Sequence, residues 1–175
     1  MKLATSISVL LLAAGMTSGQ ANAEEEFNTI QTQSINNCQA FLPAGAATRA
    51  RPLGIKNDST TTAFPVNCSW DWDFDQSLFG IDLVQAFFTN PTAAPVTVNC
   101  TFVIGWETSA TQFIAKSTSV PAGATAQGGV QLLPGDAAGG VIDGPVSMSC
   151  SLPPLVTMND NVVGWTSDDA SPEAP

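Results

Sequence analysis

VTVNCTFVIGW, residues 96–106, is the stretch that decides the fold. Its side chains alternate with the period of two that is typical of a β-strand with one buried face. One face would carry Val96, Val98, Cys100, Phe102 and Ile104, and the other Thr97, Asn99, Thr101 and Val103. We therefore expect a strand here, with the cysteine pointing into a core.

Strand-like stretches recur on both sides of this segment, and no helical face appears. They cover residues 29–38, 53–56, 63–74, 81–89, 111–120, 125–133, 146–152 and 157–165. Turn sequences separate them, such as Asn57-Asp58-Ser59 and Pro134-Gly135-Asp136. The pattern predicts an all-β chain that forms a single antiparallel β-sandwich, immunoglobulin-like or jelly-roll-like, with about eight or nine strands.

The N-terminus has the features of an export signal. Met1-Lys2 is followed by an apolar run over residues 3–15 and by the small residues Ala21-Asn22-Ala23. We expect a signal peptide over 1–23, a β-sandwich domain over 24–166 and a disordered acidic tail over 167–175. The exported protein should be secreted or periplasmic, with no membrane insertion after the signal is cleaved.

The charge balance excludes several functions. The chain has 15 acidic and 5 basic residues, a formal net charge of −10 and no histidine. Nucleic acids and anionic lipids need clustered Lys and Arg, so neither is an expected partner. The absence of histidine excludes Ser-His-Asp and Cys-His catalysis as well as His-ligated metal centres. We expect no catalytic residues and no enzyme activity.

The four cysteines predict two disulfides. Cys38, Cys68, Cys100 and Cys150 are widely spaced, whereas zinc sites use closely spaced pairs, and exported proteins commonly form disulfides. Cys38 and Cys68 bracket a returning strand, while Cys100 and Cys150 both take inward strand positions. The pairing 38–68 with 100–150 is therefore favoured among the three connectivities.

Several short motifs together resemble a group of small exported bacterial proteins of uncharacterised function. The motifs are an early Cys38, the turn at residues 54–59, Phe64-Pro65-Val66-Asn67-Cys68, the hairpin at 90–100 and Ser149-Cys150-Ser151-Leu152-Pro153-Pro154. The resemblance covers most of the chain after the signal and implies a disulfide-bonded β-sandwich without an assigned activity. The chain departs from that pattern after Cys68, where it is unusually aromatic and acidic.

The aromatic and acidic residues that follow Cys68 form the main candidate site. On a strand, its aromatic residues would share one face and its acidic residues the other: Trp70, Trp72 and Phe74 against Asp71, Asp73 and Asp75. The aromatic face could stack on sugar rings, and the aspartates could hold a structural calcium ion, the one cofactor that the sequence suggests. A third hypothesis is a carboxylate-based hydrolase, with Asp82 or Glu107 as the second acid. The plainest interpretation is that the aromatics enter the core and the aspartates keep the outer face hydrated.

The sequence therefore favours a non-enzymatic exported β-sandwich with a binding or structural role at the cell envelope or outside the cell. Its ligand would be an envelope or extracellular molecule, for which a carbohydrate is one candidate. The alternatives are a carbohydrate-binding or calcium-dependent lectin-like module that uses the Trp70–Asp75 strip, and a polysaccharide hydrolase. A structural subunit that assembles by strand addition is a further class, which an unpaired apolar edge strand would support.

Overall fold

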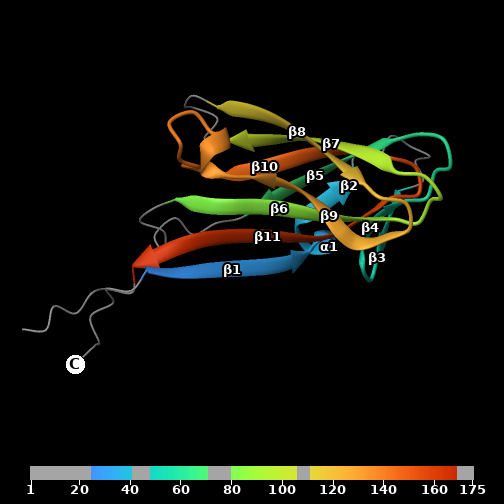
Figure 1. Cartoon of the computed structure of the whole chain (residues 1–175), viewed down its shortest axis with the longest axis horizontal. Coiled ribbons are helices and arrows are strands. Elements are labelled where there is room, and N and C mark those ends of the chain that lie inside the picture. The colour runs from blue at the N-terminus through green and yellow to red at the C-terminus, as the bar shows by residue number, and fades with distance from the viewer. Residues whose placement is uncertain (1–24, 41–47, 71–79, 106–110, 169–175) are drawn as a thin grey trace, which may run out of the picture.

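The computed structural model describes residues 25–40, 48–70, 80–105 and 111–168. These residues form two antiparallel sheets packed face to face, which confirms the predicted β-sandwich (Figure 1). No helix in this described part is both long and apolar enough to span a membrane.

One sheet has six strands. They are β1 (Glu25–Gln33), β3 (Thr48–Arg51), β4 (Gly54–Asn57), β6 (Ile81–Asn90), β9 (Ala124–Leu132) and β11 (Thr157–Asp168). Their order is β3-β4-β11-β6-β9, and β1 also pairs with β11. The long strand β11 therefore organises this sheet, because β1 and β4 share one of its edges and β6 takes the other.

The other sheet has five strands in the order β2-β5-β10-β7-β8. They are β2 (Cys38–Ala40), β5 (Phe64–Trp70), β7 (Val96–Ile104), β8 (Gln112–Val120) and β10 (Val146–Leu152). A single helical turn, α1 (Ser34–Asn37), carries the chain from β1 in the first sheet to β2 in the second. A short 3₁₀ turn, η2 (Pro134–Asp136), follows β9.

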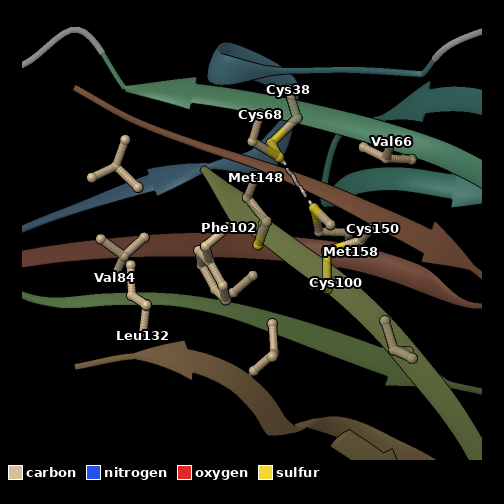
Figure 2. Close-up of a cluster of buried hydrophobic side chains, with 14 of the residues drawn as sticks. Cys38, Val66, Cys68, Val84, Cys100, Phe102, Leu132, Met148, Cys150 and Met158 are labelled. Atoms are coloured by element: carbon tan, nitrogen blue, oxygen red, sulfur yellow. Dashed lines mark hydrogen bonds between the residues drawn. A yellow bond between two sulfur atoms is a disulfide. The ribbon is translucent and has the colours of Figure 1, made fainter. Parts of the chain in front are cut away.

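The core lies between the two sheets and follows the alternation seen in the sequence. In β7, Val98, Cys100, Phe102 and Ile104 are buried, as the period of two predicts. They meet side chains from the opposite sheet such as Val84, Leu132 and Met158, which are also buried (Figure 2). Burying these side chains supplies the main driving force for folding.

Both predicted disulfides are present, Cys38–Cys68 and Cys100–Cys150. Each one joins directly opposed residues of neighbouring strands, β2 with β5 and β7 with β10. Both bridges therefore reinforce the five-stranded sheet and do not connect the two sheets. The sulfur of Met158 lies 3.6 Å from that of Cys68, so the six-stranded sheet packs on the first bridge (Figure 2).

The structure has more strands than the sequence suggested, because eleven lie within the described residues. Residues 29–38 were expected to form one weakly alternating strand, but α1 divides this region into β1 and β2. The turn is needed because β1 and β2 belong to different sheets. Strand β3 has only four residues and was not expected at all.

Two buried asparagines hold the loops at one end of the sandwich. The side-chain amide of Asn57 donates to the carbonyl oxygens of Thr62 and Leu152, at 2.8 and 2.9 Å. The side-chain amide of Asn90 donates to the carbonyl oxygens of Ala94, Val120 and Pro121. The turns that the sequence predicted at these positions are thus fixed by side chains that replace missing backbone partners.

Candidate functional site

The outer face of the five-stranded sheet contains a hollow of about 410 Å³. It lies over β2, β5 and β10, at the end of α1. Its lining is Asn37, Gln39, Ala40, Asn67, Cys68, Ser69, Ser147, Met148 and Ser149. We call this hollow the polar groove, because its outward-facing side chains are amides and hydroxyls.

Strand alternation builds the polar groove. Asn67 and Ser69 stand on either side of the buried Cys68, and Ser147 and Ser149 on either side of the buried Met148. Because buried and outward residues alternate, burial of the sulfur side chains turns their polar neighbours to the outside.

Strand register then brings the polar side chains together. Ser149 is opposite Asn67, which in turn is opposite Gln39, while Ser147 is opposite Ser69. Directly opposed side chains on one face of an antiparallel sheet lie about 5 Å apart. The groove therefore presents neighbouring hydrogen-bonding groups from three strands, which could engage adjacent hydroxyls of one ligand.

The face continues beyond the groove onto β7 and β8. Ser147 is opposite Val103, which is opposite Phe113 at the edge of the sheet. The Phe113 ring is 72% exposed, the largest exposed fraction among the large hydrophobic side chains described. Two strand spacings, about 10 Å, separate it from Ser147. An exposed ring at this distance provides an apolar platform beside the hydrogen-bonding groups.

None of the nine described residues that line the polar groove is ionisable. These nine residues can therefore donate and accept hydrogen bonds, and none of them can act as the general acid or the nucleophile of a glycoside hydrolase. The charged pairs lie elsewhere. Lys116 pairs with Asp136, and Arg51 donates to Asp58 at 2.6 Å. Partial burial alone would raise the pKa of Asp58, but hydrogen bonds from Arg51 and Lys56 outweigh this and hold the pKa below its ordinary value.

Asp136 links the β9–β10 connection to β8. Its carboxylate accepts a hydrogen bond from the Lys116 ammonium, and a second one, 2.9 Å long, from the backbone N–H of Leu133. The Lys116 hydrogen bond is the larger cause that lowers the pKa of Asp136 below its ordinary value of 3.8, and the Leu133 N–H adds to it.

Replacing Asp136 with Asn should lower the free energy of unfolding by up to about 1 kcal/mol at neutral pH, since the pair lies at the surface, with 29% and 25% of its side chains exposed, and solvent screens the attraction. A carboxylate whose pKa is lowered by folding stabilises the fold above its unfolded pKa and loses this effect as the pH falls through its folded pKa. The difference between the variant and the wild type should therefore shrink below about pH 3.8. Urea titrations of both proteins at several pH values measure this difference in the free energy of unfolding. A difference that does not change with pH would contradict the assignment of the ion pair between Asp136 and Lys116.

The structure describes one residue of the predicted aromatic and acidic strip. Trp70 ends β5 at an inward position, opposite Val146, and its half-buried ring packs against the core. Its indole N–H is buried and has no hydrogen-bond acceptor among the described residues. The other candidates, Trp72, Phe74, Asp71, Asp73 and Asp75, lie outside the described residues. The predictions of a stacking strip and of a calcium site there remain predictions.

The two remaining acidic candidates do not form a site in the described part. Asp82 accepts a 2.6 Å hydrogen bond from the hydroxyl of Thr166. Glu107 lies outside the described residues. Within the residues that the structure describes, no group of three Asp, Glu, Cys or His side chains is placed to hold a metal ion.

Sequence reasoning missed the polar groove. Each of its residues is an ordinary outward residue of a strand, and none forms a chemical motif. One signal was present, because two of the three strands under the groove carry short polar residues around a sulfur residue, in Asn67-Cys68-Ser69 and Ser147-Met148-Ser149. The strand order that places them side by side was not visible in the sequence.

No protein-family model matches the sequence, and no curated protein matches it either. Among solved structures, the chain is similar to the xylan-binding module CBM15, with 11% identity and a TM-score of 0.46 over 80% of this chain and 97% of that one. It is also similar to an exo-beta-1,3-galactanase from Phanerochaete chrysosporium, with 10% identity and a TM-score of 0.43 over 78% of this chain and 29% of the enzyme. A third similar structure is TmCBM61 in complex with beta-1,4-galactotriose, with 8% identity and a TM-score of 0.32 over 80% of this chain and 84% of that one.

Proposed function

We propose that this protein is an exported, non-enzymatic binding protein whose polar groove takes a neutral carbohydrate. The observation that carries the proposal is the composition of the groove, whose described lining residues offer amide and hydroxyl side chains and no ionisable group. Sugars present closely spaced hydroxyls that both donate and accept hydrogen bonds. Asn and Gln side chains can pair with two neighbouring hydroxyls at once, while Ser adapts by rotating its own hydroxyl.

The surroundings of the groove support the same ligand class. Phe113 offers an exposed ring on the same sheet face, and aromatic rings supply apolar contact to the flat side of a sugar. The formal net charge of −10 disfavours polyanions, so acidic polysaccharides should bind more weakly than neutral ones. Two disulfides are typical of proteins that work in an oxidising compartment, where extracellular glycans occur.

A panel of polysaccharides tests the proposal. The purified exported protein would be run in native gels that contain neutral xylan, galactan, β-glucan or mannan, and in matched gels with polygalacturonate. We expect at least one neutral polymer to retard the protein, and polygalacturonate not to retard it. Bovine serum albumin in each gel controls for sieving by the polymer. Unchanged mobility in every neutral polymer, or retardation by polygalacturonate alone, would overturn the proposal.

A further inference from the structure

The outward residues of the five-stranded sheet include no charged residue. Lys116 is the one charged residue in its five strands, and it belongs to the inward set, since it lies opposite the buried Cys100 and pairs with Asp136. Every outward position of β2, β5, β7, β8 and β10 holds an uncharged residue that is exposed or half-buried. The neutral surface is therefore larger than the polar groove, which occupies three of the five strands.

This neutrality restricts the class of ligand. The chain has 15 acidic and 5 basic residues, and exposed strand surfaces are commonly covered by charged side chains. A polyanion would meet no cation on the outward side of these strands, and a polycation would meet no carboxylate. A neutral molecule with many hydroxyls leaves no charge unmatched there, so the whole face suits the ligand class proposed for the groove.

Strand register arranges the outward residues in rows that cross the sheet. The five strands lie side by side in the order β2-β5-β10-β7-β8 (Figure 1). One row has a residue from each of them, and each residue is directly opposite the next: Gln39, Asn67, Ser149, Thr101 and Ala115. Four strand spacings, about 19 Å, separate its two ends.

A second row runs beside the first, two residues further along the strands and about 7 Å away. It contains Ser69, Ser147, Val103 and Phe113, one from each strand from β5 to β8. Both rows begin with hydrogen-bonding side chains in the polar groove and end with an apolar side chain on β8. Val103 extends the apolar surface of Phe113 towards the groove, so the two regions are continuous.

We propose, on the premise that the proposed function is correct, that an extended neutral polysaccharide chain lies across the strands between these two rows. Neighbouring strands are about 4.8 Å apart, and a sugar residue in an extended chain has a similar length. Three sugar residues fill the polar groove over β2, β5 and β10, and a fourth lies over Thr101 and Val103. A fifth sugar residue stacks on the Phe113 ring.

The position of Phe113 determines the direction of the chain. Phe113 lies two strands away from Ser147 in the groove, at the edge of the sheet. A chain that followed the strands would remain over the groove and would not reach the ring. A chain that crosses the strands contacts both the groove and Phe113. The ligand is therefore an extended segment of about five sugar residues and not a single terminal sugar.

Calorimetric titration with oligosaccharides tests this binding mode. The ligands would be a trisaccharide and a pentasaccharide from the neutral polymer that retards the wild-type protein most. We expect the pentasaccharide to bind at least about tenfold more tightly, because it contacts β7 and the Phe113 ring as well as the groove. Phe113→Ala should lower the affinity for the pentasaccharide by about fivefold, which reduces the difference between the two lengths. Phe113→Trp keeps an aromatic platform and should retain the wild-type affinity.

Phe27→Ala is the matched control, because Phe27 is 56% exposed and lies on the other sheet. It should leave the affinities for both oligosaccharides unchanged. Circular dichroism and the melting temperature would establish that each variant is folded. Equal affinities of the wild type for the two lengths, or an unchanged affinity of Phe113→Ala for the pentasaccharide, would overturn the proposed chain direction and leave a site confined to the groove. If no neutral polymer binds, the proposed function fails together with this binding mode.

Discussion

Replacing both Cys100 and Cys150 with alanine is expected to lower the free energy of unfolding by about 4 kcal/mol. The bridge joins directly opposed residues of β7 and β10 and closes a sequence separation of 50 residues. Closing a loop of this length restricts the unfolded chain by an amount that corresponds to about 4 kcal/mol in the chain-entropy model. Both cysteines are buried, so their removal also leaves space in the core. Denaturant titration of the oxidised variant and wild type measures the difference.

The Cys38–Cys68 bridge provides the comparison. It closes a separation of 30 residues, so its removal should cost slightly less, about 3.5 kcal/mol. This bridge also holds β2, a three-residue strand whose one strand partner among the described residues is β5. Hydrogen exchange at β2 should therefore rise more in this variant than in the other. A loss below about 1 kcal/mol for either pair would contradict a role for the bridges in stability.

Phe102→Ala is expected to lower the free energy of unfolding by about 3–5 kcal/mol. The ring is fully buried in the C-terminal half of β7, with 0% of its surface exposed. Truncation removes a large apolar side chain from the region between the sheets and leaves a cavity that the neighbouring strands cannot close completely. Thermal or denaturant unfolding followed by circular dichroism measures the loss.

Phe113→Ala is the matched control. It lies in the same β7–β8 hairpin, where Val103 is its cross-strand neighbour, but its ring is exposed. Its truncation should change the stability by less than about 0.5 kcal/mol. If both variants lost the same stability, the assignment of inward and outward faces on this hairpin would be wrong.

Much of the fold could be predicted because strand alternation is a local property. The segment around Phe102 was assigned its inward and outward faces from spacing alone, and both were confirmed. The disulfide pairing was also predicted, since Cys100 and Cys150 occupy inward positions on strands. The helical turn α1 was missed because four residues are too few to show a helical period.

The candidate site could not be predicted in the same way. The polar groove depends on which strands are neighbours, and Gln39, Asn67 and Ser149 lie in distant parts of the chain. Asn57 was recognised as a turn residue, but its burial, like that of Asn90, depends on the carbonyl groups of Leu152 and Val120 at the ends of other strands. Trp70 was placed on a strip whose exposure the sequence left open, and its ring packs against the core.

The polar groove and the fold have the same origin. The sulfur side chains that fix the inner face of the five-stranded sheet force their polar neighbours outward, and the bridges hold the strands of that sheet together. The proposed binding face is thereby built on strands, which hold side chains more rigidly than loops do. A preformed face of this kind would lose little conformational entropy when it binds a ligand.

The most direct test of the proposed function compares two pairs of substitutions. Asn67→Ala with Ser149→Ala removes two opposed polar side chains from the groove, while Gln85→Ala with Gln131→Ala removes two opposed polar side chains from the six-stranded sheet. Affinity would be measured in gels containing the neutral polysaccharide that retards the wild-type protein most. We expect the groove pair to weaken binding by about thirtyfold, because each of the two lost hydrogen bonds contributes about 1 kcal/mol, and the control pair to leave it unchanged. Unchanged binding by the groove pair, or equal losses in both pairs, would contradict a binding site in the polar groove.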